Sequence, residues 1–211
     1  MYYINSKMEP FIMNNIIKYF LDHSGYARMQ DLKEASFHTR DIAKLLKEGK
    51  IEKIKPGYYR LTDMNHPDHI PQSFIDIAHL IPKGVICLLS ALEYYNLTTF
   101  NPPEVYVAIP QSEKFPKMKY PPIRGYYFPK RFYSEGIEYI ESNNIKIKIY
   151  SAEKSIADMF RYRKKLGEDI AIEALKTYLA RKGANINRLY EYAETCQVKT
   201  VMNPYIKAIV G

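Results

Sequence analysis

Basic side chains recur through one segment of this 211-residue chain, the run "FHTRDIAKLLKEGKIEKIKPGYYRL" at residues 37–61. Arginine and lysine at such spacing can bind phosphate, and arginine and threonine can also hydrogen-bond the edges of bases. The segment is therefore a candidate site for binding double-stranded DNA. Its candidate contacts are His38, Thr39, Arg40, Lys44, Lys47, Lys50, Lys53, Lys55, Tyr58 and Arg60.

Three short helices are predicted to position these side chains, because apolar residues recur at helical spacing over residues 13–25, 26–36 and 37–50. Gly25 and Gly49 are expected to end the first and third helices. The residues predicted to face inward are Ile16, Ile17, Phe20 and Leu21, then Leu32 and Ala35, and finally Ile42, Leu45 and Leu46.

A charged hairpin is predicted directly after the third helix. Pro56-Gly57 supplies a tight turn, with Ile51 and Ile54 facing inward and the lysines before the turn facing water. Three helices followed by a basic hairpin is the order of a winged helix-turn-helix, whose third helix enters the major groove of DNA. The same order would also fit a winged helix that contacts another protein and has its lysines on a solvated face.

The formal net charge of +8 is unevenly distributed along the chain. Residues 1–63 hold 11 basic and 8 acidic residues (+3), residues 64–145 hold 7 and 8 (−1), and residues 146–211 hold 13 and 7 (+6). A basic excess at both ends favours a polyanionic partner. A basic protein without such a partner could carry the same charge.

Composition also indicates the compartment. No apolar run approaches the length of a membrane span, and the first residues lack the apolar centre of a signal peptide. Cys87 and Cys196 lie far apart and do not suggest a disulfide framework. We therefore expect a cytoplasmic protein that has no contact with a membrane.

Residues 62–72, "TDMNHPDHIPQ", are polar and interrupted by prolines, which predicts a domain boundary. A helical pattern follows at 72–81, and residues 84–97 are an apolar run that leads into a helix. Strand patterns follow at 104–110 and 123–129, a hairpin at 136–151, and four helices from residue 151 onward. The predicted class is α+β. It comprises a winged helix-turn-helix DNA-binding domain at 1–63, a linker at 64–72 and a C-terminal α/β domain at 73–211, with a small sheet and a helical tail.

Residues 114–133 hold six basic residues, seven aromatic residues and no acid. Basic residues interleaved with aromatics can hold nucleic acid by phosphate contact and stacking. The alternative is a proline-broken loop and strand whose aromatics pack on the sheet, and the pattern alone fits both.

The helix predicted from Ser151 onward carries a second candidate surface. Ile156, Met159 and Phe160 form its apolar stripe, and four charged residues recur on the opposite face. They form either a solvated face with ion pairs or a docking face for an acidic partner protein. These candidate partner-binding residues are Lys154, Asp158, Arg161 and Lys165.

Catalytic signatures were not found in the sequence. It has no glycine-rich phosphate loop, serine elbow or cysteine–histidine signature. His66 and His69 have a metal-like spacing, but they lie in the predicted linker without cysteine partners. Pro67-Asp68 would suit a nuclease only with an acid-x-Lys step downstream, and no acid after residue 68 has lysine two positions later. We predict no catalytic residues, no metal, no cofactor and no enzymatic activity.

Several motifs resemble the AbiEi antitoxins of type IV (AbiE) toxin–antitoxin systems. The N-terminal one is "MQDLKEASFHTRDIAKLLKEGKIEKIKPGYYRL", which ends in a Gly-x-Tyr wing at Gly57-Tyr58-Tyr59. The C-terminal ones are "GVICLLSALEYYNLTT", "PPEVYVAIP" and "IYSAEKSIADMFRYRKKLGEDIAIEALKTYL". The last holds the family-like pattern at Glu153, Lys154, Ala157, Asp158, Arg163 and Lys165.

This resemblance implies a two-domain antitoxin and transcriptional repressor. Its winged helix would bind inverted repeats in the promoter of its own operon. Its C-terminal domain would counteract a cognate nucleotidyltransferase-like toxin. The alternatives are a winged-helix regulator without a toxin partner and, more distantly, an enzyme that processes nucleic acid.

Overall fold

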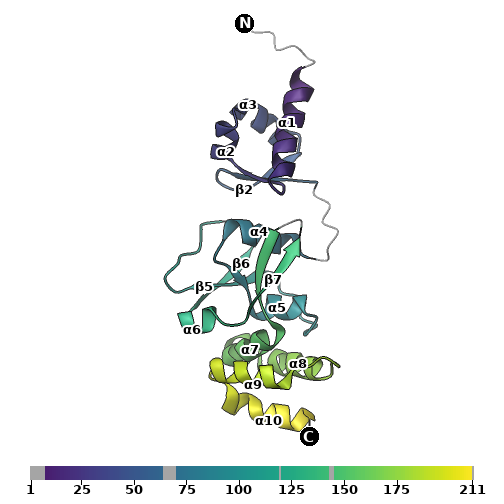
Figure 1. Cartoon of the computed structure of the whole chain (residues 1–211), viewed down its shortest axis with the longest axis vertical. Helices are drawn as coiled ribbons and strands as arrows, with labels where there is room; N and C mark the ends of the chain where they lie inside the picture. The colour runs from purple at the N-terminus through teal and green to yellow at the C-terminus, as the bar shows by residue number, and fades with distance from the viewer. Residues whose placement is uncertain (1–7, 64–69, 119, 143–144, 211) are drawn as a thin grey trace. The chain divides into compact units, whose positions relative to one another are not determined.

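The computed structural model describes residues 8–63, 70–118, 120–142 and 145–210, with side chains from residue 12 onward. Helices and strands are mixed along these residues, which confirms the predicted α+β class. The chain divides into two compact units (Figure 1). The N-terminal unit is Met1–His69 with Met118–Tyr120, and the C-terminal unit is Ile70–Lys117 with Pro121–Gly211.

The N-terminal unit has the element order of a winged helix. Its elements are α1 (Met8–Asp22), β1 (Tyr26–Arg28), α2 (Met29–Glu34), α3 (Thr39–Lys47), β2 (Ile51–Lys55) and β3 (Tyr58–Leu61). The three strands form one antiparallel sheet in the order β1-β3-β2. One apolar core joins helices and sheet, because the amphipathic helices bury their apolar stripes against it. Its most buried members include Ile16, Phe20, Leu32, Ile42, Leu45 and Ile51.

Two predictions for this unit are wrong in detail. Residues 26–28 form a strand rather than the start of a helix, because they pair with β3 and complete the sheet. Leu21, Ala35 and Leu46 are exposed rather than inward-facing. In so small a unit each helix buries a narrow stripe, which one residue every three or four positions already fills.

The C-terminal unit is built around a five-stranded mixed sheet in the order β6-β5-β4-β8-β7. Its strands are β4 (Val85–Ile86), β5 (Val105–Pro110), β6 (Ile123–Phe128), β7 (Ile137–Ser142) and β8 (Ile145–Tyr150). Its helices are α4 (Gln72–Leu80), α5 (Leu88–Tyr94), α6 (Lys130–Tyr133), α7 (Ala152–Leu166), α8 (Glu168–Leu179), α9 (Ile186–Thr195) and α10 (Lys199–Val210). Every predicted element is present in this unit. Two short elements were not predicted: α6, and β4 within the apolar run at 84–97.

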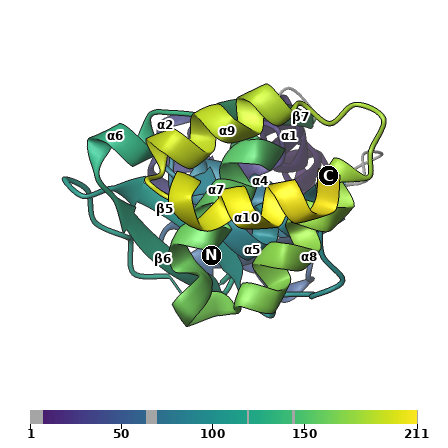
Figure 2. The ribbon, with the colours of Figure 1, turned by 90° about the horizontal axis from the view of Figure 1, so that it is seen from below.

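Both faces of the sheet are covered. Alternate residues such as Ala108 and Phe128 join one core with α5, α7, α8, α9 and α10. Residues of the other phase, including Val107 and Ile149, are also buried, and α4 packs against β8. Figures 1 and 2 show α7 next to the sheet, with α8, α9 and α10 gathered around it. Helix α7 is therefore enclosed by sheet and helices.

Candidate nucleic-acid interface and the buried ionic centre

The first turn of α3 presents three of the predicted contacts to solvent. His38 is the N-cap residue and makes no side-chain capping bond, and His38, Thr39 and Arg40 are all exposed. The Arg40 side chain is 68% exposed, and its Nε lies 3.6 Å from the carboxylate of the next residue, a surface pair worth little. Ile42 and Leu45 anchor the opposite side of α3 in the core. Packing thus fixes the turn while its polar side chains stay accessible.

The predicted lysine contacts lie along α3 and the hairpin. Lys47 and Lys53 are exposed, whereas Lys44 is half-buried. Lys50 is also exposed, and its Nζ lies 3.1 Å from Glu48 Oε2. Lys47 and Lys53 are therefore the most accessible of these cations.

Tyr58 and Arg60 are not the exposed contacts that the sequence predicted. Their exposed fractions are 8% and 7%. The Arg60 guanidinium donates to Glu52 Oε1 from Nη2 at 2.5 Å and from Nε at 3.1 Å, so its charge is neutralised within the sheet. The Tyr58 ring lies within 6 Å of the Arg28 and Lys55 cations. Their burial disfavours direct DNA contact by these two residues, and that contact stays an untested prediction.

The predicted charged face of α7 is wrong for two of its four residues. Lys154 and Asp158 both have 0% exposed side chains and form an ion pair one helical turn apart. Lys154 Nζ also lies 4.4 Å from the centroid of the Tyr150 ring. Because the sheet and helices enclose the first half of α7, every residue from Glu153 to Phe160 is buried, on the polar side as well as on the apolar stripe. Lys154 and Asp158 are part of the core and cannot form a docking surface.

The buried carboxylate of Asp158 has two partners from the protein. Lys154 is one, and Cys196 Sγ donates to Asp158 Oδ1 at 3.3 Å as the other. Burial raises the pKa of Asp158, and the neighbouring Lys154 ammonium opposes that rise. Burial also raises the pKa of Cys196, which keeps the thiol protonated as the donor. Cys87 and Cys196 are both free and buried.

Arg161 and Lys165 occupy the outer part of the predicted face. Arg161 is half-buried, with its Cζ 3.5 Å from the centroid of the Phe132 ring. Its Nη1 is buried without a hydrogen-bond partner among the described residues. Lys165 is exposed, and its Nζ lies 5.4 Å from the Tyr126 ring centroid. Lys165 thus reaches solvent and Arg161 is partly exposed, in contrast to Lys154.

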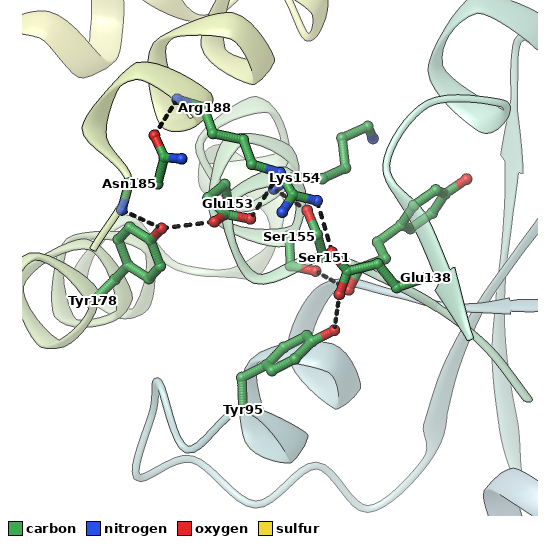
Figure 3. Close-up of polar contacts among 10 residues, drawn as sticks. Tyr95, Glu138, Ser151, Glu153, Lys154, Ser155, Tyr178, Asn185 and Arg188 are labelled. Carbon is green, nitrogen blue, oxygen red and sulfur yellow. Dashed lines mark hydrogen bonds and ion pairs between the residues drawn. The ribbon is translucent and has the colours of Figure 1, made fainter. Parts of the chain in front are cut away.

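A polar cluster beside the Lys154–Asp158 ion pair joins five elements of the C-terminal unit (Figure 3). Tyr178 Oη donates to Glu153 Oε1 at 2.7 Å, and Arg188 Nε lies 3.6 Å from Glu153 Oε2. Arg188 Nη2 donates to Glu138 Oε1 at 2.6 Å, and Tyr95 Oη donates to Glu138 Oε2 at 3.2 Å. One guanidinium thus bridges two carboxylates, and each carboxylate also accepts from a phenol. Burial, and then the bond to Glu153, raise the pKa of Tyr178 to about 12.

This cluster fastens α5, β7, α7, α8 and α9 to one another. Sequence reasoning did not find it, because its residues are separated by up to 93 positions, from Tyr95 to Arg188. One local signal was present: Asn185 precedes an apolar-periodic run, and its Oδ1 accepts from the Arg188 backbone N–H as an N-cap. Asn185 N–H in turn donates to Tyr178 Oη. The charged and phenolic groups of the cluster thus bond to one another, and these bonds hold the five elements together.

The basic-aromatic stretch at 114–133 is partly packed structure. Tyr126, Phe128 and Phe132 are buried in the core of the C-terminal unit. The Phe115 ring covers Gly125, where a Cβ would come within 2.5 Å of the ring. Tyr127 is 49% exposed. Packing accounts for the buried rings, and nucleic-acid contact by the exposed side chains stays a prediction.

The residues that the structure describes contain neither a metal-binding group nor a membrane-spanning helix. Among them, no group of three or more histidine, cysteine or acidic side chains is arranged so that it could hold a metal ion. His66, His69 and Pro67-Asp68 lie outside the described residues. No helix formed by the described residues is both long enough and apolar enough to cross a membrane.

The N-terminal unit therefore defines a class, a winged helix whose third helix presents an exposed polar first turn. Residues 15–62 match a family model described as "Transcriptional regulator, AbiEi antitoxin". This match confirms the similarity to the AbiEi family that the motifs indicated. It spans the winged helix and does not extend into the C-terminal unit. No curated protein matches the chain.

Proposed function

We propose that the chain is an antitoxin and transcriptional repressor that binds inverted repeats in the promoter of its own operon. The observation that carries this proposal is the exposed turn of His38, Thr39 and Arg40, which sits on a core-anchored helix within the family match. Lys47 and Lys53 would add phosphate contacts. Arg40 would read base edges in the major groove.

A binding titration tests this proposal. One duplex is the DNA upstream of the gene, and the other is a scrambled sequence of equal length. Binding to each is measured by fluorescence anisotropy at several salt concentrations. Arg40→Ala should cost about 1–3 kcal/mol on the promoter and relax sequence preference, whereas Lys53→Ala should weaken both duplexes alike. Lys18→Ala, an exposed lysine of α1, is the charge-matched control. Equal wild-type affinity for the two duplexes would contradict specific binding.

The antitoxin part of the proposal concerns the C-terminal unit. By similarity to the family, this unit would counteract a nucleotidyltransferase-like toxin in the cytoplasm. Arg161 and Lys165 remain candidate contacts, because Lys165 is exposed and Arg161 is partly exposed. Growth rescue on co-expression with the neighbouring toxin gene tests this, with Arg161→Glu/Lys165→Glu compared with the wild type. Full rescue by the folded double variant would remove these two residues from the interface.

A regulator without a toxin partner is the second candidate. It is favoured by one observation, that the family match is confined to residues 15–62. The neighbouring gene discriminates the two. A nucleotidyltransferase-like gene whose expression arrests growth supports the antitoxin, and a neighbour with no such effect supports the regulator alone.

A further inference from the structure

Three side chains form a cross-strand row at the tip of the wing. Arg28 on β1 and Lys55 on β2 are both in register with Tyr58 on β3, the central strand. Residues directly opposite one another in a sheet project to the same face. Arg28, Tyr58 and Lys55 therefore stand side by side, with the aromatic ring between the two cations. Arg28 lies outside the run of basic residues in which the sequence predicted DNA contacts.

Tyr58 holds the two cations. The Arg28 Cζ lies 5.9 Å and the Lys55 Nζ 5.4 Å from the centroid of the ring, within the range of cation–π attraction. Because Tyr58 is buried, its ring is fixed by packing and gives both flexible side chains a preferred position. Arg28 is exposed and Lys55 half-buried, so both cations remain open to a ligand.

The two cations of this row have no close carboxylate partner among the described residues. In the next row along the sheet, Glu52 pairs with Arg60. By contrast, neither Arg28 nor Lys55 has a carboxylate partner within 4 Å among the residues that the structure describes. Burial, and then the charge of Arg28, lower the pKa of Lys55. Two like charges are thus held close enough to oppose each other, and an anion bound by both would relieve that repulsion.

The turn of the wing is fixed to the helical part of the unit. The Met29 backbone N–H, next to Arg28, donates to the Gly57 carbonyl at 2.8 Å. Gly57 has a φ of +72°, which the turn requires and which glycine adopts without strain. This bond sets the two cations at a constant position relative to α2.

We propose that Arg28 and Lys55, positioned by Tyr58, form a clamp for one backbone phosphate of DNA at the wing. The clamp rests on the proposed DNA-binding function and adds to it a site that is independent of base sequence. Arginine offers paired N–H donors to phosphate oxygens and lysine offers a point charge. Tyr58 is a positioning residue here, which gives this buried side chain a role without direct contact to DNA.

Fluorescence anisotropy with the full chain tests the clamp on promoter DNA and on unrelated DNA of equal length. Arg28→Ala/Lys55→Ala should lower affinity for both duplexes about tenfold or more. It should also reduce the slope of log affinity against log salt by about 0.9, the value for one phosphate. Tyr58→Phe keeps the ring and should stay within about twofold of wild type, whereas Tyr58→Leu should lose part of the affinity with both cations present. Lys18→Ala is the control for loss of one surface charge, and far-UV circular dichroism verifies folding.

The outcomes separate the clamp from the proposed function. If the wild type binds both duplexes equally but the clamp variants still lose affinity and slope, specific promoter recognition fails and the clamp stands. If the wild type prefers its promoter and the folded clamp variants match Lys18→Ala, the clamp is overturned and the proposed function stands. If no duplex binds, both fail. If inorganic phosphate displaces DNA far better than chloride at equal ionic strength, the site belongs to a free phosphate ligand and the DNA assignment is overturned.

Discussion

Replacing Lys154 with methionine is the sharpest test of the buried ionic centre. Lys154 and Asp158 are both fully buried and paired with each other, with the Lys154 ammonium also near the rings of Phe128 and Tyr150. Methionine keeps most of the volume of lysine and removes its charge. The carboxylate of Asp158 would then be buried without its ammonium partner.

The loss of stability has a calculable ceiling, because Asp158 can take up a proton instead of remaining charged. Neutralising a carboxyl group with an ordinary pKa near 3.9 costs about 4 kcal/mol at pH 7 and about 1.5 kcal/mol at pH 5. Breaking a buried pair by removing one partner typically costs about 3–5 kcal/mol, which agrees with the value at pH 7. In the variant the folded-state pKa of Asp158 lies above its unfolded value. Its stability deficit should therefore be small near pH 4 and grow as the pH rises.

Urea unfolding followed by far-UV circular dichroism at pH 5 and pH 7 measures this. Lys165→Met, on the exposed side of the same helix, is the matched control and should change the free energy of unfolding by about 0.5 kcal/mol or less. The double variant Lys154→Met/Asp158→Asn should lose less than the sum of its single variants by about 2 kcal/mol, since it removes both charges. Hydrogen exchange of α7 amides assigns the effect to the C-terminal unit, because a chain of two units need not unfold in two states.

Two results would refute this reasoning. One is a Lys154→Met loss that matches Lys165→Met, which would mean that the pair is not buried as described. The other is an equal loss at pH 5 and pH 7, which would mean that the cost is one of packing rather than of an unpaired carboxylate.

Three further predictions concern the His79 side chain, the glycine at position 136 and enzymatic activity. Burial lowers the pKa of His79 to about 4, so its stabilising contribution is complete above pH 6.5 and is lost as the pH falls toward 4, by up to about 3 kcal/mol. Unfolding at pH 7 and pH 4.5 measures this, and His79→Gln should flatten the difference; a slope unchanged in that variant would contradict it. Gly136→Ala should destabilise the chain by about 2 kcal/mol, because Gly136 has a φ of +74° and a Cβ there would lie 2.8 Å from Lys154 Cβ. Thermal unfolding of both variants measures this. Gly183→Ala is the control and should stay near wild type, because a Cβ at Gly183 would have no other atom within 4 Å. The purified protein should neither cleave DNA or RNA nor transfer nucleotides, with or without magnesium, and turnover that Glu153→Gln abolishes in a folded protein would overturn that expectation.

Local periodicity predicted most elements of this fold. Ile42 and Leu45 are buried on α3, and Ile51 and Ile54 on the hairpin, because the period of an apolar pattern directly reports which side of an element faces the core. The strand at 26–28 was missed because three residues have no period of their own. Its pairing with β3 is a tertiary contact.

The candidate site was less predictable than the fold. Charges at helical spacing have the same pattern on a solvated face and inside a core, so the sequence alone wrongly predicts Lys154 and Asp158 on the surface. Only the enclosure of α7 by sheet and helices decides between the two. Arg60 was misjudged for a similar reason, because its pairing with Glu52 depends on the register of the hairpin.

The burial of this pair changes how the C-terminal motif is interpreted. Glu153, Lys154 and Asp158 belong to the C-terminal motif in which the sequence predicted a resemblance to AbiEi antitoxins, and all three are buried: Lys154 and Asp158 pair with each other, and Glu153 accepts from Tyr178. The motif therefore describes how α7 is held in its unit and not a surface that a partner could contact. Substitutions there that abolish growth rescue would act by unfolding the unit, and soluble yield would fall with them. Substitutions at the exposed Lys165 would act at the surface and leave the yield unchanged, whereas those at the half-buried Arg161 would also remove its packing on Phe132. If the unit counteracts a toxin as proposed, the residues that contact the toxin should accordingly be sought on the exposed side of the unit, outside this buried motif.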